Sequence, residues 1–364
     1  MEDFFIQIVE SERQNDILEE LKKESLPLVI WGNGSMSYSV RKILRHYEIE
    51  PVACWVDHAD ITEVDGMPVM SIEEIVKKYG AVNIVFGHSR YELADAISEK
   101  EGIHKCFCLI NVCYEQWKHL TYEFVLTHKE EYERTYQWLE DDLSKKCLTA
   151  FLNCKLTEDF HYILPVYQEH ISYFSNPFFE ITESESLVDI GAYDGDTIRD
   201  FLKVRKCYER IYAIEPERES VNRLRAYISK TKLKNIDVYP YGCWNQNTEL
   251  DFCEDQESSG VGSGGETKLK VYKLDDLLKN KKVSIIKINF LTGVCETLEG
   301  ASGILKEQMP KLMIMAGFDE WGLIQIPQMI KAINSHYKIA IRYAAAMPAR
   351  LILGASQSLC KPPN

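Results

Sequence analysis

The sequence predicts an α/β protein with two doubly wound, Rossmann-like domains joined by a helical connector. Its 364 residues suit two or three globular units, at roughly 150 residues per domain. Short apolar runs alternate with amphipathic stretches in the first and last thirds, the pattern of parallel sheets covered by helices. The middle holds long charged helical stretches instead. We expect an N-terminal helix at 1–26, a small Rossmann-like domain at 27–113, a connector at 114–180 and a larger domain at 181–364.

The small domain follows from four strand candidates that are separated by helix candidates. In order, these segments are the strand PLVIW, a helix at Ser35–Tyr47, the strand PVACWVD, the helix SIEEIVKKYG, the strand VNIVF, the helix YELADAISEK and the strand KCFCLINV. Ser71 and Glu74 have the spacing of a capping box and mark the start of the second helix. The alternation predicts one small parallel sheet that ends near Val112.

The larger domain contains nine strand candidates. They are SLVDIGA, RIYAIEP, NIDVYPYGCW, ELDFCE, KLKVYKLDD, VSIIKINF, KLMIMAGF, KIAIRYA and ARLILGA. A Gly/Ser-rich stretch, QESSGVGSGGET at 256–267, separates the fourth from the fifth. We expect no regular element there, and either a loose hairpin loop or a lid over a site.

Charge and hydropathy exclude several kinds of partner. Asp and Glu number 56 against 42 Lys and Arg, and the net charge of −14 repels phosphate backbones. Nucleic acid is therefore not an expected partner. The first 23 residues lack the apolar core of a signal peptide, and no uncharged apolar run approaches the roughly 20 residues of a membrane span. We expect a cytoplasmic protein without membrane insertion, and the sequence leaves its oligomeric state open.

Four residues within a short segment are of types that bind zinc. They are His104, Cys106, Cys108 and Cys113. The segment HKCFCLINVC contains no CxxC pair, and its alternation from Cys106 onward is typical of a strand whose side chains point to opposite faces. We therefore expect a strand and no metal site.

The most specific motif is the turn VDIGAYDGDT. An apolar strand ends at Asp189 and leads into a Gly191-x-x-x-Gly195 turn that opens a helix. The G-x-G-x-x-G that binds a dinucleotide pyrophosphate is absent, and D-x-G-x-x-x-G is the turn expected for S-adenosylmethionine. Asp189 would hold the cofactor's ammonium directly or through water. Ala192, Asp194 and Thr197 belong to the same candidate site, although acids at the start of a helix, Asp194 and Asp196, also suit its dipole without a ligand.

An acidic residue stands where a nucleoside ribose would need it. Glu215 ends the next strand, about two dozen residues after Gly191, the place where an acid binds ribose hydroxyls in nucleotide-binding α/β folds. Strand, turn, helix, strand and acid follow one another in the expected order. We therefore include Glu215 in the cofactor site.

The first domain offers a weaker candidate for a second nucleotide site. WGNGSMS places Gly32 and Gly34 after a strand, and Asp57 closes the next strand. Ser37 replaces the third glycine of the dinucleotide motif, so a purely structural turn is an equal alternative to nucleotide or sugar-nucleotide binding. His88, after the third strand, would face the same crevice.

From Ser172 to Ala355 the sequence resembles the FkbM family of S-adenosylmethionine-dependent methyltransferases. The similarity lies in blocks that follow one another in the family's order: SYFSNPFFE, ESLVDIGAYDGDT, IYAIEP, YGCW, ELDF, KLDDLL, IIKIN, LEGA and MIKAINSHYKIAIRY. The resemblance implies a class I methyltransferase-like sheet, with Asp189, Gly191, Gly195 and Glu215 at the cofactor. It also implies methyl transfer, commonly to a hydroxyl of a sugar, glycan precursor or other small metabolite.

The substrate side departs from the family pattern. Asn289, Phe290, Leu291 and Thr292 stand where the family has D-x-E-G, and Gly317 and Phe318 replace a Tyr-His pair. No usual catalytic acid or imidazole can be assigned, which leaves Asn289, Asp319 and Glu320 as weak candidates. Asp275 and Asp276, in KLDDLL, are explained by helix capping. Two alternatives remain open, a catalytically degenerate cofactor-binding protein and a nucleotide or sugar-nucleotide binder that works through its first domain.

Overall fold

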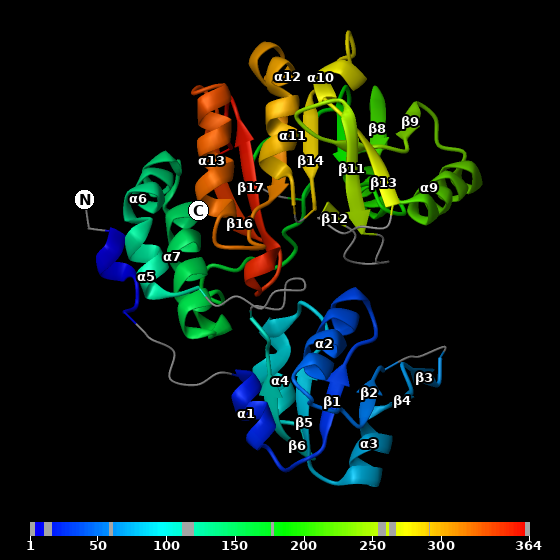
Figure 1. The fold of residues 1–364 in the computed structure, drawn as a ribbon, viewed down its shortest axis with the longest axis vertical. Helices are drawn as coiled ribbons and strands as arrows, with labels where there is room; N and C mark the ends of the chain where they lie inside the picture. The colour runs from blue at the N-terminus through cyan, green and yellow to red at the C-terminus, as the bar shows by residue number, and fades with distance from the viewer. Residues whose placement is uncertain are drawn as a thin grey trace. The chain divides into compact units, whose positions relative to one another are not determined.

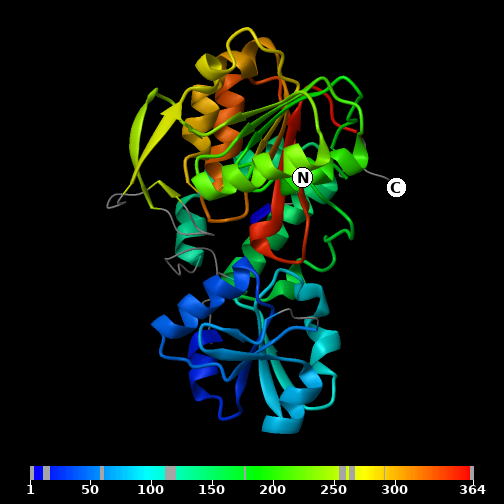
Figure 2. The same cartoon turned by 90° about the vertical axis from the view of Figure 1, so that its right-hand side faces the viewer.

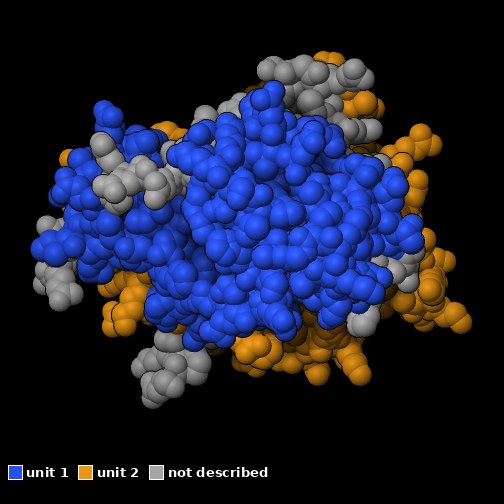
Figure 3. All heavy atoms as spheres, turned by 90° about the horizontal axis from the view of Figure 1, so that it is seen from below, with its two compact units in different colours: residues 1–129, 147–168, 345–350 blue, residues 130–146, 169–344, 351–364 orange. Residues whose placement is uncertain are grey.

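A computed structural model describes residues 4–10, 17–57, 61–110, 120–175, 178–253, 260–261, 267–290 and 292–360. Contacts between residues divide the chain into two compact units, coloured separately in Figure 3. Unit 1 comprises 1–129, 147–168 and 345–350, and unit 2 comprises 130–146, 169–344 and 351–364. The expected connector therefore contributes to both units. Its helices are α5 (Tyr122–Thr127), α6 (Lys129–Trp138) and α7 (Asp142–Thr157).

Unit 1 contains a six-stranded sheet in the order β3-β4-β2-β1-β5-β6 (Figure 1). Its strands are β1 (Leu28–Trp31), β2 (Ala53–Trp55), β3 (Glu63–Val64), β4 (Met67–Met70), β5 (Val82–Phe86) and β6 (Ile103–Phe107). Within the described part of this sheet, the β3–β4 pair is antiparallel and the other pairs are parallel. The chain builds β2 and β4 on one side of β1 and then places β5 on the other, so the strand order reverses beside β1.

The first four helices are α1 (Ile17–Lys23), α2 (Ser35–His46), α3 (Ile72–Tyr79) and α4 (Ala94–Ser98), with a 3₁₀ turn η1 at Phe4–Gln7. Among them, α2 and α3 begin where the sequence predicts them, whereas α1 begins only at Ile17 and α4 at Ala94, after a 3₁₀ turn at Tyr91–Leu93. The capping box of α3 is present, because the Glu74 amide donates to Ser71 Oγ and the Ser71 amide donates to the Glu74 carboxylate. The N-terminal helix is shorter than the expected 1–26, and 11–16 lie outside the described residues. The fourth predicted strand, KCFCLINV, is confirmed only in part: β6 ends at Phe107, so Cys108 and the two residues after it lie beyond the strand, and 111–113 lie outside the described residues.

Unit 2 is built around a seven-stranded sheet in the order β16-β17-β15-β14-β7-β8-β9. Its strands are β7 (Ser186–Ile190), β8 (Arg210–Ile214), β9 (Ile236–Tyr239), β14 (Ile285–Ile288), β15 (Lys311–Met315), β16 (Lys338–Tyr343) and β17 (Leu351–Ser356). β17 is antiparallel to both of its neighbours, and the other pairs are parallel. The strand order reverses between β7 and β14, the place where open α/β sheets bind ligands.

The helices of unit 2 connect the strands of this sheet. They are α8 (Asp196–Val204), α9 (Arg218–Thr231), α10 (Leu274–Leu277), α11 (Val294–Gly300), α12 (Ser302–Glu307) and α13 (Gly322–Ile333). Helices α11 and α13 lie side by side (Figure 1). The sheet core between the layers includes Leu187, Ile211, Ile285 and Met313, all completely buried. Within the described part of the chain, no helix is long and apolar enough to cross a membrane.

Four short strands of unit 2 form a second sheet in the order β10-β13-β11-β12. They are β10 (Gly242–Cys243), β11 (Thr248–Cys253), β12 (Gly260–Val261) and β13 (Thr267–Tyr272). Figures 1 and 2 show the β11–β13 hairpin, in yellow, as a layer separate from the main sheet. The prediction of no regular element in 256–267 is wrong for Gly260, Val261 and Thr267, because strand pairing uses backbone groups and needs no apolar side chain. Most of that Gly/Ser-rich stretch, and so the predicted lid, lies outside the described residues.

Candidate functional site

The turn after β7 requires both of its predicted glycines. Gly191 and Gly195 have φ angles of +75° and +89°, a region that residues with side chains rarely adopt. A Cβ atom on Gly191 would lie 2.7 Å from the Asn289 backbone oxygen, so this turn and the segment after β14 are in close contact at the reversal of strand order. A Cβ atom on Gly195 would lie 2.9 Å from Leu224 Cδ1 in α9. The motif thus fixes a tight backbone turn that is packed on both sides.

Asp189 points into the protein interior. Its side chain is completely buried, and Lys287 Nζ in β14 lies 2.9 Å from Asp189 Oδ1. Burial raises the pKa of Asp189 to about 6, against the opposing attraction of Lys287. Lys287 also donates to the Gly191 carbonyl at 2.9 Å. Asp189 therefore orients Lys287, which in turn holds the glycine turn, and its carboxylate is not exposed to a ligand.

Glu215 connects the end of β8 to the same turn. Its Oε2 accepts the Tyr193 amide at 2.8 Å, and its Oε1 accepts the Glu217 amide at 2.9 Å. The residue is 7% exposed, and burial raises the pKa of its carboxyl group. Two ionised oxygens offer about four acceptor positions, of which these bonds use two. The structure thus brings the predicted turn and the predicted acid together, with acceptor capacity left over.

The other residues of the predicted cofactor set have contacts within the protein. Ala192 and Thr197 are buried, and Asp194 Oδ1 is 2.7 Å from the Arg199 guanidinium. Asp196 Oδ1 accepts the Thr197 amide at the start of α8, as expected of an acid in the first turn of a helix. Sequence reasoning missed Tyr193, which has a φ of 46° and is 41% exposed.

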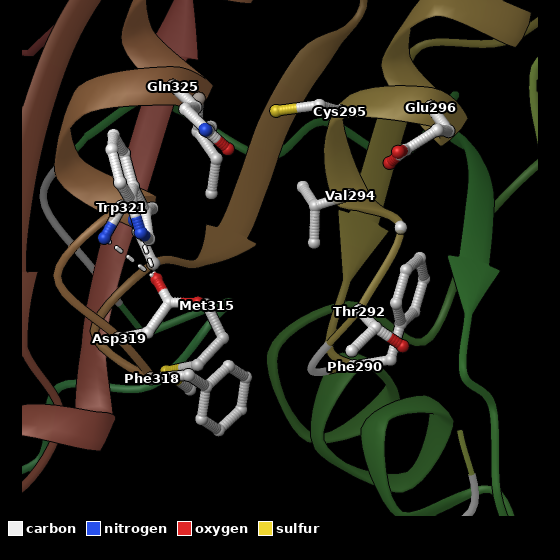
Figure 4. A pocket seen from close by; sticks show the side chains of 14 residues that line it. Phe290, Thr292, Val294, Cys295, Glu296, Met315, Phe318, Asp319, Trp321 and Gln325 are labelled. Atoms are coloured by element: carbon white, nitrogen blue, oxygen red, sulfur yellow. Dashed lines mark hydrogen bonds between the residues drawn. The ribbon is translucent and has the colours of Figure 1, made fainter. Parts of the chain in front are cut away.

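A pocket of about 250 Å³ opens at the carboxyl ends of β14 and β15 (Figure 4). Its walls come from the first turns of α11 and α13 and from the loops that precede them. It is lined by Phe290, Thr292, Gly293, Val294, Cys295, Glu296, Met315, Ala316, Phe318, Asp319, Trp321, Gly322, Gln325 and Ile326. The pocket therefore occupies the position where the sequence departs from the family pattern, although Leu291 lies outside the described residues.

Only one of the three catalytic candidates lines this pocket. Asp319 does, but its Oδ1 accepts the amides of Trp321 and Gly322 at 3.0 and 2.8 Å and so caps α13. The backbone oxygen of Glu320 accepts the Tyr132 hydroxyl at 2.9 Å, and Glu320 is not a lining residue. Asn289 is half-buried beside Gly191 and does not line the pocket either.

Glu296 and Cys295 are pocket residues that sequence reasoning missed. Both lie in the first turn of α11, after Gly293, whose φ is +92°. Burial raises the pKa of the Cys295 thiol to about 11, and the charges of Glu296 and Asp319 act in the same direction. The sequence did contain a signal for Glu296, because this residue lies only a few positions after β14, the strand that pairs with β7 where the strand order reverses. Many acids occupy first helical turns without a ligand, so that signal is not specific.

Two family-like blocks hold α11 in place. A Cβ atom on Gly293 would lie 2.2 Å from Trp244 Cζ3, and one on Gly300 would lie 2.0 Å from the Trp244 backbone oxygen. The Thr297 hydroxyl donates to the Cys243 carbonyl at 3.1 Å. The YGCW and LEGA segments are thus explained by close packing. Asp275 accepts the amides of Gly303 and Ile304, and so caps α12 rather than its own helix.

Unit 1 has its own reversal of strand order, where the weaker candidate lies. Gly32 has a φ of +110°, and a Cβ atom there would lie 3.2 Å from the Gly87 oxygen and 3.4 Å from His88 Cδ2. Asp57, which is exposed, accepts the Trp55 indole N–H at 2.9 Å. The pKa of His88 is lowered to about 4, chiefly by burial.

The remaining residues of this turn show structural contacts. The Ser37 hydroxyl is buried and accepts a bond from Arg41 at 2.8 Å. Gly34 precedes α2, with no atom within 4 Å of the place a Cβ would take. A nucleotide site at Gly32, Gly34 and Asp57 stays a prediction. No group of three or more His, Cys, Asp or Glu side chains suited to a metal ion was found among the residues that the structure describes.

Comparison with known proteins gives a clear result for the fold. No family model matches the sequence, and no curated protein matches it. Among solved structures, methyltransferase FkbM from Methylobacillus flagellatus KT aligns with a TM-score of 0.66 and 20% identity, over 94% of each chain. The resemblance predicted from the sequence is thus confirmed at the level of the fold. It also extends over both units, whereas the sequence blocks span only about half of the chain.

More distant matches involve about half of this chain. An rRNA methylase from Streptococcus thermophilus aligns over 48% of this chain and 88% of its own, with 13% identity and a TM-score of 0.33. Precorrin-6y C5,15-methyltransferase from Geobacter metallireducens GS-15 aligns over 50% and 82%, with 13% identity and a TM-score of 0.31. Similarities this weak support no argument about this chain.

Proposed function

We propose that the protein is an S-adenosylmethionine-dependent methyltransferase that acts on a small molecule through residues 181–364. One observation carries the proposal. The Gly191–Gly195 turn and Glu215 meet where the strand order reverses, next to a pocket at the ends of β14 and β15. Cofactor and acceptor would then occupy neighbouring positions along one sheet edge, as methyl transfer requires. The FkbM-like fold supports the same activity.

The residues around the turn fit this cofactor. Glu215 has acceptor positions for two ribose hydroxyls beyond its bonds to Tyr193 and Glu217. The backbone of Gly191 and its neighbours would face the amino-acid part of the cofactor. Asp189 would act through Lys287, as a positioning residue. When bound, S-adenosylmethionine supplies a methyl group on a positively charged sulfur.

The acceptor would lie in the pocket and lose a proton there. We propose O-methylation of a sugar, glycan precursor or other small metabolite, as the family resemblance suggests. Taking the proton from a hydroxyl is worth about 10²- to 10⁴-fold in rate. Asn289 cannot take it, and Asp319 already caps α13 through two amides. We therefore place Glu296, a carboxylate of the pocket wall, as the group that accepts the proton.

Calorimetric titration with S-adenosylhomocysteine tests the cofactor site. Glu215→Gln should weaken binding at least tenfold, because an amide group provides fewer acceptors for a diol. Glu219→Gln is the matched control, since it removes the same charge from an exposed position in α9. Equal affinity in the two variants, or no binding to the unmodified protein, would refute the proposal. Binding without turnover of any acceptor would instead favour the degenerate cofactor-binding alternative.

A further inference from the structure

We propose that the pocket takes a small, positively charged acceptor with an apolar, aromatic body, and not a phosphorylated or carboxylated one. The inference rests on the proposed function and narrows its acceptor class. It comes from three features of the pocket: the character of its walls, the sign of its charges and the state of the two helix ends that face it.

The walls contain three aromatic side chains among polar ones. Phe290 and Phe318 stand on the two loops that lead to α11 and α13, and Trp321 lies in the second of these loops (Figure 4). Val294, Met315 and Ile326 extend the apolar surface. The volume of about 250 Å³ lies below the roughly 300–1,000 Å³ of sites for larger ligands. A single ring with a short side chain suits this space, whereas a nucleoside diphosphate sugar does not.

The charges of the pocket have one sign. Glu296 and Asp319 both line it, and no Lys, Arg or His occurs among its described lining residues. Glu296 lies in the first turn of α11 and Asp319 in the loop before α13, and both charges help burial to raise the pKa of the Cys295 thiol. This thiol stays neutral near pH 7. An anionic acceptor would therefore meet two negative charges and no cation, while an ammonium group would be attracted.

A free helix N-terminus would oppose this preference, since it attracts anions. At α13 a carboxylate of the protein already accepts the free amides, and at α11 a carboxylate lies in the first turn. Asp319 accepts the Trp321 and Gly322 amides at the start of α13. Glu296 lies in the first turn of α11. The start of α13 is thus compensated by Asp319, the charge of Glu296 opposes the dipole of α11, and the pocket keeps a negative charge for a cationic ligand.

Calorimetric titration of the full chain with two probes of opposite charge tests the inference. Tyramine carries a phenol and an ammonium group, and 3-(4-hydroxyphenyl)propionate carries the same phenol with a carboxylate. Each is titrated with and without saturating S-adenosylhomocysteine. We expect tyramine to bind at least tenfold more tightly, a difference of about 1.4 kcal/mol. Glu296→Gln should abolish most of this preference.

Glu299→Gln is the matched control, because it removes the same charge one turn along the same helix, at an exposed residue outside the pocket. It should keep the preference. Equal binding of both probes, tighter binding of the carboxylate, no binding of either, or equal loss in the two variants would each overturn the inference. A failure of the proposed cofactor site would appear separately, because S-adenosylhomocysteine would not bind. The probe titrations carried out in the absence of S-adenosylhomocysteine would still test the inference.

Discussion

The two units share a glycine turn at the reversal of strand order but differ in the polar groups around it. Each sheet reverses its strand order beside its first strand, and each places a glycine with positive φ there, Gly32 or Gly191. In each, a Cβ atom would press on the backbone oxygen of the segment across the reversal, at 3.2 Å for Gly87 and 2.7 Å for Asn289. The close approach of backbone at the reversal of strand order therefore requires a glycine, and the glycine turn by itself does not identify a ligand site.

What surrounds the turn distinguishes the units. In unit 2 a buried ion pair, Asp189–Lys287, supports the turn, and the acid Glu215 is buried and bonded to backbone amides. In unit 1 the corresponding acid, Asp57, is exposed and accepts an indole N–H. The difference indicates that several buried polar groups hold the turn of unit 2 in a fixed geometry. Variants at matched positions of the two units can test whether these groups stabilise unit 2.

The largest effect is expected from the buried ion pair. Lys287→Met leaves the Asp189 carboxylate buried without its cation, which should lower the free energy of unfolding of unit 2 by about 3–5 kcal/mol. Hydrogen exchange of the β7 and β14 amides measures the loss, with the β1 and β5 amides as the internal reference. The double variant Asp189→Leu/Lys287→Met should recover much of the stability. A single variant as stable as the unmodified protein would show that the pair does not support the turn.

The two glycines give the next comparison. Gly191→Ala should destabilise unit 2 by about 1–3 kcal/mol, because alanine is strained at positive φ and its Cβ would press on a backbone oxygen. Gly32→Ala should cost unit 1 less, since its nearest contact is longer. Only the Gly191 variant should also weaken S-adenosylhomocysteine binding. The comparison would fail if Gly32→Ala weakened that binding as strongly.

The paired acids should differ by a smaller amount. Glu215→Gln places an amide group against backbone N–H donors and should destabilise unit 2 by about 1–2 kcal/mol. Asp57→Asn changes an exposed group and should stay within about 0.5 kcal/mol. Chemical denaturation, monitored by hydrogen exchange in each unit, measures the loss of stability in both variants. A larger loss from Asp57→Asn would mean that unit 1, too, depends on its strand-end acid.

The weakest effect expected is an opposite response to pH. Asp189 has a raised pKa of about 6, so the folded state binds its proton more tightly than the unfolded state does, and its contribution to stability falls as the pH rises from about 4 to 6. His88 has a lowered pKa of about 4, so its contribution grows as the pH rises from 4 through 6.5. Calorimetric melting of the Asp189→Asn and His88→Asn variants against the unmodified protein, from pH 4 to 7, should show the two opposite slopes. Parallel slopes would contradict the assignment.

Local patterns in the sequence predicted most of the elements and the glycine turn after β7. The strand candidates, the capping box of α3 and the meeting of the glycine turn with Glu215 all depend on residues near one another or on strand ends that a parallel sheet brings together. The direction of the Asp189 side chain could not be predicted. It depends on Lys287, about a hundred positions away, which becomes its neighbour only through strand pairing.

The sequence by itself determined the α/β class, the order of most elements and the residues of the glycine turn, because hydrophobic periodicity and turn chemistry are local properties. Only the tertiary structure decided which acids face the pocket. The Asp319 carboxylate caps α13, and Glu320 does not line the pocket. Glu296 lines the pocket because Gly293 and Gly300 pack against Trp244 and so fix the position of α11. A pocket is defined by contacts between segments distant in sequence, and such contacts exist only once the sheet has brought them together.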